Sequence, residues 1–245
     1  MNKLPQITFA FWVMKICATT LGETAGDLLS MTMGIGYAAS SLILISIFII
    51  TLVVQLFSKS YHPFLYWTVI LSTSTAGTTM SDYMDRTLGL GYATGSAVLI
   101  TLLVCVLAVW RWNVGSLSVT NISSKKGELF YWTAILFSNT LGTALGDYLA
   151  DDSGLGFAGG ALLIASALAL ITAAYYATSL SRIGLFWAAF ILTRPFGATM
   201  GDLMTKSTEK GGFDFGTIGS SAVLAALLIV FIIMTYAKEK KRNIN

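Results

Sequence analysis

Charge is scarce in this chain, and histidine, cysteine and proline are scarcer still. Of its 245 residues only 11% are charged, whereas 55% are hydrophobic, and the mean hydropathy is +0.74. A globular domain carries about 25% charged residues, so the composition excludes a water-soluble fold of this length. A helix needs about 20 mostly apolar residues to cross the ~30 Å of a bilayer. The sequence therefore predicts a polytopic membrane protein whose first partner is lipid.

One histidine and two cysteines leave little room for soft-metal or disulfide chemistry. Cys17 and Cys105 lie far apart in apolar stretches, and His62 lies in a short connecting loop. This disfavours a zinc or copper site and a disulfide framework. The chain lacks a Gly-x-x-x-x-Gly-Lys-Ser/Thr sequence, which argues against ATP-driven pumping by this chain alone. Its 15 basic residues are dispersed among short loops, so we expect no nucleic-acid partner.

A motif recurs four times. Each copy ends at an aspartate that is preceded by a glycine or serine, with a glycine five residues earlier and a tryptophan fifteen residues earlier. The tryptophans are Trp12, Trp67, Trp132 and Trp187, and the aspartates are Asp27, Asp82, Asp147 and Asp202. The first three copies continue with Gly-x-Gly and an aromatic residue, whereas the fourth has about three extra residues near Gly211. Such regular recurrence indicates internal duplication.

Each copy of the motif belongs to a repeat with two apolar segments. The predicted repeats cover 7–57, 64–112, 129–178 and 184–236, in two similar halves, 1–115 and 125–240, of a single transmembrane domain, 1–245. Two spans per repeat insert all four repeats in the same direction, unlike inverted-repeat transporters. The predicted fold class is therefore all-α, with eight transmembrane helices as four parallel two-helix repeats related by pseudo-symmetry about the membrane normal.

The distribution of basic residues predicts the orientation. On the side of the termini we count ten basic residues, against three on the other side, so both termini are expected in the cytoplasm. Each motif tryptophan follows an aromatic residue and is expected to anchor its helix at the inner interface. The ten are Lys3, Lys59, Arg111, Lys125, Lys126, Arg182, Lys238, Lys240, Lys241 and Arg242, and the three are Arg86, Lys206 and Lys210.

Four motif aspartates at one depth predict a site. Fifteen residues of helix rise about 22 Å, which places the aspartates toward the outer end of each motif helix. Carboxylates inside a membrane face the bundle interior, and four around one axis repel one another unless they hold protons or a cation. Glu23 shares the face of Asp27 and is a fifth candidate ligand. The alternative is that the aspartates cap helices near the outer loops.

The residues around the aspartates suit a hard cation. Threonines four or seven positions earlier share the helix face and are expected to support the site: Thr20, Thr75, Thr78, Thr140 and Thr143. Oxygen ligands favour Mg²⁺, Mn²⁺, Ca²⁺ or a trivalent ion. Four methionines near two of the aspartates would favour Mn²⁺ or Fe²⁺ as ligands, although packing is their commoner role: Met80, Met84, Met200 and Met204.

Two further features concern packing and charge. Each motif contains a small-xxx-small pair, which lets helices approach closely: Gly22 and Gly26, Gly77 and Ser81, Gly142 and Gly146, and Gly197 and Gly201. Arg194 lies near the centre of its span beside Pro195, where we expect it to pair with Glu23 or Asp27, as a structural pair or a gate. Lys15 is expected to extend to the cytoplasmic interface.

The repeats resemble a bacterial membrane-protein repeat family of unknown function. The likeness covers nearly the whole chain and is carried by segments such as KICATTLGETAGD (15–27) and WTAILFSNTLGTALGD (132–147). The resemblance implies a location in the bacterial inner membrane and a link to metal resistance, including aluminium and manganese. The fourth repeat departs from the pattern at Arg194-Pro195 and at its insertion.

These observations predict a secondary transporter, most simply an exporter, of a multivalent cation. Mn²⁺, Fe²⁺, Mg²⁺ or Al³⁺ would be its substrate rather than a resident cofactor. Transport would be driven by exchange for protons, as in an antiporter, or by the membrane potential. Two alternatives stay open: a membrane scaffold or sensor that transports nothing, and an intramembrane aspartyl enzyme. Four equivalent aspartates fit a symmetric site better than an acid and a base with opposite roles, so we expect no enzyme activity. The sequence leaves a homo-oligomer open.

Overall fold

The described part of the chain is all-α. The computed structural model describes residues 3–119, 122 and 124–242, with side chains to residue 237, and these contain eight α-helices and no strand. The helices are α1 (Phe9–Asp27), α2 (Tyr37–Phe57), α3 (Pro63–Asp82), α4 (Tyr92–Val114), α5 (Lys125–Asp147), α6 (Gly156–Ala177), α7 (Arg182–Thr205) and α8 (Thr217–Arg242). Each of the eight predicted apolar segments forms one helix, which confirms the all-α prediction.

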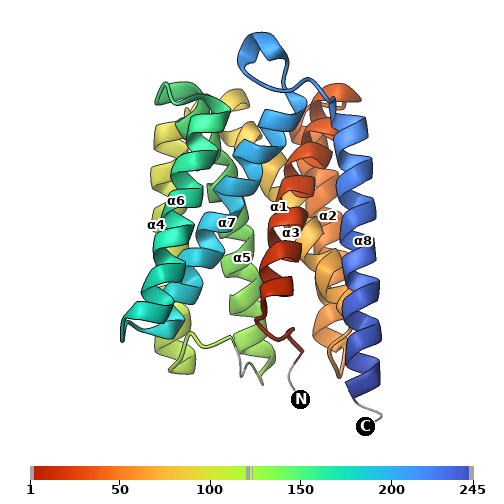
Figure 1. Ribbon diagram of the computed structural model, residues 1–245, viewed down its shortest axis with the longest axis vertical. Helices are drawn as coiled ribbons and strands as arrows, with labels where there is room; N and C mark the ends of the chain where they lie inside the picture. Colours follow the sequence, from red (N-terminus) through yellow and green to blue (C-terminus); the bar gives the residue numbers. More distant parts are fainter. Residues whose placement is uncertain (1–2, 120–121, 123, 243–245) are drawn as a thin grey trace.

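The helices form two layers. The four motif helices, α1, α3, α5 and α7, pack against one another in a closed ring, which we call the inner ring. Each of the other helices packs against the motif helix that follows it, so α2 lies on α3, α4 on α5 and α6 on α7, while α8 returns to α1. Both ends of the described chain lie at one end of the bundle (Figure 1), which we call the terminus end.

Composition explains the two layers. Five helices are long and apolar enough to cross a membrane, namely α2, α4, α6, α7 and α8. The motif helices α1, α3 and α5 are more polar, and they bury that polar surface in the ring. The outer helices instead expose large apolar side chains such as Leu42, Ile50 and Leu162. An apolar exterior around a polar interior is the arrangement expected of a bundle in lipid.

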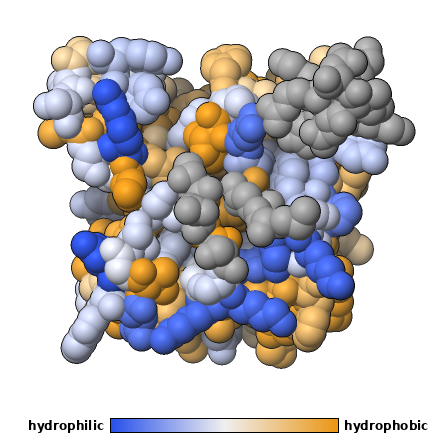
Figure 2. Space-filling model, turned by 90° about the horizontal axis from the view of Figure 1, so that it is seen from below, coloured by the Kyte–Doolittle hydropathy of each residue, from blue (hydrophilic) through white to orange (hydrophobic). Residues whose placement is uncertain are grey.

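The terminus end carries basic side chains. Figure 2 shows this end, where hydrophilic residues gather. Its exposed basic residues are Lys59, Arg111, Lys125, Lys126 and Arg182. Four other basic residues of the sequence count, Lys238, Lys240, Lys241 and Arg242, have side chains outside the described part.

The first three motif helices end in the same way. After Asp27, Asp82 and Asp147 the chain makes a five-residue π-helical turn, at Leu28–Thr32, Tyr83–Thr87 and Tyr148–Asp152. The Gly-x-Gly sequence then reverses the chain into the next helix. Both of its glycines have positive φ in all three repeats, 70° and 83° at Gly34 and Gly36, a conformation that glycine adopts without steric cost. The motif therefore encodes a helix end and a turn.

The motif tryptophans lie inside the bundle rather than at the lipid surface. Trp67, Trp132 and Trp187 are at most 5% exposed, and Trp12 packs against the same core. The aromatic residue before each tryptophan contacts the tryptophan of the next repeat, and these contacts close a ring: Phe11 on Trp67, Tyr66 on Trp132, Tyr131 on Trp187 and Phe186 on Trp12. The expectation that the tryptophans anchor their helices at the interface is therefore wrong for Trp67, Trp132 and Trp187, which are buried between helices, whereas Trp12 is half-buried.

The glycine pairs hold the inner ring together. The glycine five residues before each motif aspartate packs against the neighbouring motif helix, at the residue eight positions before that helix's aspartate. The four contacts are Gly22 on Ser74, Gly77 on Asn139, Gly142 on Arg194 and Gly197 on Thr19. The second small residue packs one turn along, as Gly26 does on Thr78, Gly146 on Ala198 and Gly201 on Glu23. A side chain at these positions would overlap the neighbouring helix, so the small residues set the helix separation.

Replacing Gly22 by alanine tests this packing. A Cβ at Gly22 would overlap Ser74 Oγ and Cβ, so we expect Gly22→Ala to lower the free energy of unfolding by roughly 1–3 kcal/mol. The matched control is Gly219→Ala in α8, where a Cβ meets nothing within 4 Å and alanine is the better helix former. Denaturation of both variants in detergent micelles gives the comparison. Equal stability of the two variants would contradict the packing account.

Candidate functional site

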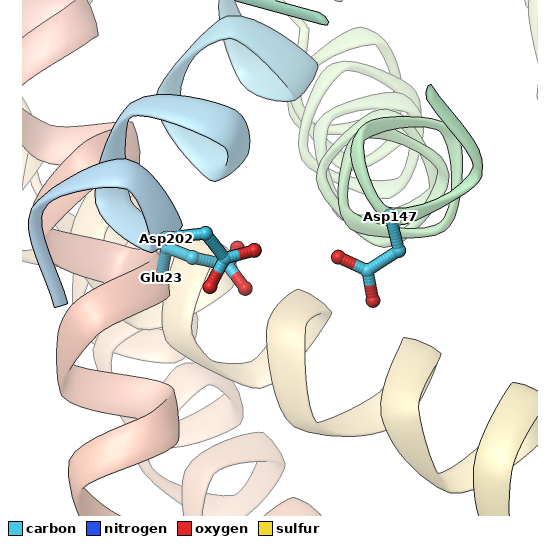
Figure 3. Close-up of side chains that lie close together, drawn as sticks. All are labelled: Glu23, Asp147 and Asp202. Atoms are coloured by element: carbon cyan, nitrogen blue, oxygen red, sulfur yellow. The ribbon is translucent and has the colours of Figure 1, made fainter. Parts of the chain in front are cut away.

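The inner ring brings three carboxylates from three helices together. Glu23 on α1, Asp147 on α5 and Asp202 on α7 each offer an oxygen atom, and these atoms lie within 4.8 Å of one another. All three residues are at most 3% exposed. In Figure 3 the Glu23 and Asp202 carboxylates lie side by side, and that of Asp147 points toward them from the opposite helix. Oxygen ligands converging from separate helices could hold a cation.

Arg194, eight residues before Asp202 on α7, links all four inner helices. It is fully buried on α7, and its Nη1 donates to Glu23 Oε2 at 2.9 Å. Its Nη2 donates to the hydroxyls of Thr78 (2.6 Å) and Thr143 (2.7 Å), which lie on α3 and α5. Of the two partners that the sequence suggested for Arg194, the structure has Glu23. The pair is buried, so removing one member would leave an uncompensated charge in the ring.

Two cations that the sequence analysis placed only in outer loops complete the site. Arg86 Nε lies 2.9 Å from Asp82 and its Nη2 2.9 Å from Asp147, so its guanidinium bridges α3 and α5. Lys206 Nζ lies 2.5 Å from Asp27 and 3.0 Å from Asp202, so its ammonium bridges α1 and α7. The sequence did contain a signal, because both residues stand four positions after a motif aspartate, where the other two repeats have Met31 and Asp151.

The bridging cations stay charged and lie nearest to solvent. Burial lowers the pKa of Lys206, but Asp202 and Asp27 outweigh burial and raise it overall. Arg86 is likewise held charged, because Asp82 and Asp147 raise its pKa against the effect of burial. The side chain of Arg86 is 31% exposed and that of Lys206 is 18% exposed, whereas the four aspartates are at most 4% exposed. The two cations thus cover the carboxylates from the end opposite the termini.

The formal charges of the ring do not balance. We call Glu23 and the four motif aspartates the carboxylate site. Its five carboxylates pair with three cations, Arg86, Arg194 and Lys206, which leaves two formal negative charges at the site. Lys15, the other buried cation of the inner ring, has no hydrogen-bond partner among the described residues and is left out of this count. Asp85 is not part of this count, because its carboxylate lies against Gly95 of α4, outside the ring.

The predicted threonines divide into two groups. Thr78 and Thr143 donate to Glu23 Oε2 at 3.3 and 3.1 Å, so both reach the site. The other three bond to carbonyl groups one turn earlier in their own helices: Thr20, Thr75 and Thr140. The threonine four residues before the aspartate therefore faces the interior of the ring. The hydroxyl of the threonine seven residues before it donates instead to a carbonyl group of its own helix.

The methionines pack rather than face the carboxylates. Met84 and Met204 contact the main apolar core, and Met200 packs against Ala150, Phe157 and Leu203. Met80 is half-buried. These contacts favour the packing role for the methionines and leave the oxygen atoms as the candidate ligands.

The capping interpretation of the aspartates is wrong for the first three repeats. Asp27, Asp82 and Asp147 lie at the carboxyl ends of their α-helices, and none makes a side-chain cap hydrogen bond to the turn that follows. Their carboxylates instead face Lys206 or Arg86. The chain continues in helical conformation through the π-helical turn, so no free amides are left for a carboxylate to cap.

Lys15 does not extend to the interface as the sequence suggested. It is fully buried, with Nζ 4.1 Å from the centre of the Phe190 ring. The aromatic residues of the terminus end, including Phe11 and Trp67, close the bundle beyond it. A snorkelling side chain needs an open path along its helix surface, and here neighbouring helices fill that path.

Breaking the central pair tests its role in stability. Arg194→Met strands the Glu23 carboxylate, and we expect a loss of about 3–5 kcal/mol in the free energy of unfolding. Adding Glu23→Gln removes the stranded charge, so the double variant is expected to recover part of the loss. Arg182→Gln, an exposed arginine on the same helix, is the control. Denaturation in micelles would contradict the account if Arg194→Met were as stable as this control.

A pH dependence follows from Asp85, in the turn beyond α3. Burial raises the pKa of Asp85 from 3.8 to about 6, against the opposing effects of Ser81 and Arg86. The folded state therefore binds this proton more tightly than the unfolded state, and its contribution to stability falls as pH rises from about 4 to about 6. We expect Asp85→Asn to be more stable than wild type at pH 8, with a smaller difference at pH 4.

Melting temperatures of the purified protein at both pH values measure this effect. Asp152→Asn, an exposed residue at the same end, controls for the loss of a surface charge. A difference between Asp85→Asn and wild type that is the same at pH 4 and pH 8 would contradict the raised pKa.

Comparison with known proteins identifies the family but not a function. A family model described as a repeat of unknown function (DUF347) matches residues 10–61, 65–115, 130–181 and 185–241. No curated protein and no solved structure matches the chain. Because the four matches together cover most of the sequence, the chain belongs to the DUF347 family and contains four tandem copies of its repeat.

Proposed function

We propose that this protein is a secondary transporter of a divalent metal cation, and that all eight helices cross the membrane. The outer helices present an apolar surface, and the ring helices have similar lengths of 19 to 24 residues. The bundle is then embedded with its terminus end in the cytoplasm, which agrees with the exposed basic residues at that end. The fold supports insertion of four repeats in one direction.

Equivalent contacts support pseudo-fourfold symmetry about the membrane normal. The glycine contacts and the aromatic contacts both pass from each repeat to the next and close at the first. Such a ring places one aspartate per repeat at a common depth. Glu23 and Arg194, which occur once each at neighbouring levels of the ring, break this symmetry.

The carboxylate site is the observation that carries the proposal. Oxygen atoms of Glu23, Asp147 and Asp202 lie within 4.8 Å of one another, and all three residues are at most 3% exposed. Carboxylate and hydroxyl oxygens are ligands for hard cations such as Mn²⁺ and Mg²⁺. The two unbalanced negative charges match one divalent ion better than Na⁺ or a trivalent ion. Mn²⁺ is our first candidate substrate, with Fe²⁺ and Mg²⁺ next.

The bridging cations suggest how the site opens. Arg86 and Lys206 form ion pairs with aspartate oxygens and are the most solvent-exposed charged groups of the site. A metal ion arriving at or leaving toward the outer end must pass them, so each must release one aspartate. At the other end the aromatic ring closes the bundle. In the proposed orientation this end faces the cytoplasm, so we infer a state that is closed toward the cytoplasm, and transport would require that end to open in turn.

Flux into liposomes tests the proposal. The purified protein is assayed with Mn²⁺, Fe²⁺, Mg²⁺, Ca²⁺, Zn²⁺ and Al³⁺, with internal pH recorded. We expect saturable flux of a divalent ion, and a fall of at least about tenfold in the Asp147→Asn, Asp202→Asn double variant. The control is Asp152→Asn, which removes an exposed carboxylate at the same end of the bundle and leaves the inner ring unchanged. Its flux should equal that of wild type.

The alternatives predict different outcomes. A scaffold or sensor gives no flux of any ion from folded protein and instead binds a partner. Flux that is unchanged in the double variant would show that ions pass without using these carboxylates, and the proposed site would be wrong.

A further inference from the structure

Lys15 is a buried cation that the carboxylate site does not use. It lies on α1, eight residues before Glu23, and is fully buried. Its Nζ has no hydrogen-bond partner within the described structure and lies over the face of Phe190, 4.1 Å from the centre of the ring. An ammonium group without an acceptor is costly inside a membrane protein, and a cation–π contact compensates for only part of that cost.

The level of Lys15 is otherwise apolar. The equivalent positions, twelve residues before each aspartate, are Ile70, Ile135 and Phe190, and all three are fully buried. This layer separates the carboxylate site from the aromatic residues of the terminus end. Three repeats fill the position with a hydrocarbon side chain, so packing alone does not require an amine there. A single amine in an apolar layer between the site and the cytoplasmic end indicates a chemical role.

Arg194 is the charged group that faces Lys15. On α7 it lies four residues after Phe190, the position equivalent to Lys15, which is about 6 Å along the helix. Its guanidinium donates hydrogen bonds to Glu23, Thr78 and Thr143. The other helices packed against α1 contribute apolar side chains at this depth, Ile70 from α3 and Leu228 and Ile232 from α8, and Ile135 of α5 lies in the same layer. Lys15 therefore responds to the charge of Arg194 and, through Arg194, to the state of Glu23.

We propose that Lys15 carries the proton that is exchanged for the metal ion. When a divalent cation binds the carboxylate site, it draws Glu23 away from Arg194. The uncompensated guanidinium then disfavours a second positive charge on Lys15, whose ammonium group loses one proton to water and becomes a neutral amine. When the metal ion leaves, Glu23 returns to Arg194 and the amine takes up one proton again. One proton is thus exchanged per ion at Lys15.

This inference rests on the proposed transport function and predicts a specific loss. Lys15→Met keeps the length of the side chain and removes the titratable group. We expect it to fold and to retain downhill Mn²⁺ flux in liposomes, while the number of protons moved per Mn²⁺ falls by about one. A pH gradient should then drive less Mn²⁺ accumulation than in wild type.

Two further variants make the test sharp. Lys15→Arg keeps a positive charge but does not release its proton at accessible pH. The number of protons moved per Mn²⁺ should therefore fall by about one in this variant as well. Ile70→Met repacks the same layer without altering a titratable group, and its proton-to-metal ratio should equal that of wild type. Gel filtration in detergent confirms folding of each variant before reconstitution.

The outcomes separate the two proposals. Absence of flux of any cation through wild-type protein refutes the transport function and this inference with it. Wild-type flux with an unchanged proton-to-metal ratio in both Lys15→Met and Lys15→Arg refutes the role of Lys15 alone. Loss of one proton per ion in both variants, with the ratio intact in Ile70→Met, establishes it.

Discussion

A fully buried ion pair between Arg194 and Glu23 connects the last repeat to the first at the centre of the bundle. The guanidinium also donates hydrogen bonds to threonine hydroxyls on α3 and α5, so one side chain on α7 contacts the other three helices of the inner ring. Removing two charges from water is expensive unless their remaining hydrogen-bonding groups are satisfied. The hydroxyls of Thr78 and Thr143 accept hydrogen bonds from Nη2 of Arg194, whereas its Nε has no hydrogen-bond partner among the described residues. Gly142 leaves room for the stem of Arg194, because a Cβ at Gly142 would overlap it. Ring packing and site chemistry therefore depend on the same few positions.

Duplication and divergence have different roles in this structure. The repeated residues build the frame: tryptophans at one end, small residues along the contacts and aspartates at the other end. The residues that occur once, Lys15, Glu23 and Arg194, lie in successive layers of the frame. Arg86 and Lys206 occur in alternate repeats, and each bridges one pair of aspartates. A symmetric frame thus holds an asymmetric line of charges along its axis, which the proposed transport of a cation would use.

The sequence predicted the parts of the structure that follow from periodicity. Eight apolar segments, four motif helices and the pairing of Arg194 with a carboxylate of the first repeat, either Glu23 or Asp27, could be inferred because spacing and the cost of buried charge constrain them. The ion pairs of Arg86 and Lys206 were missed because they depend on where each helix ends. The π-helical turn extends the helical path beyond Asp82, which brings Arg86 back to the aspartate four residues earlier. The position of Lys15 was predicted wrongly because a lysine one turn from a tryptophan suggests an interface only when that tryptophan faces lipid. Here Trp12 packs against the core of the bundle, and Trp67 of the neighbouring helix is buried.

The most direct test of the account is the location of Mn²⁺ in crystals of the protein, measured by anomalous diffraction. The account predicts one strong anomalous peak among Glu23, Asp147 and Asp202, with Arg86 or Lys206 moved away from an aspartate oxygen. Peaks confined to exposed acidic residues, with the three carboxylates and their ion pairs unchanged at saturating Mn²⁺, would contradict it.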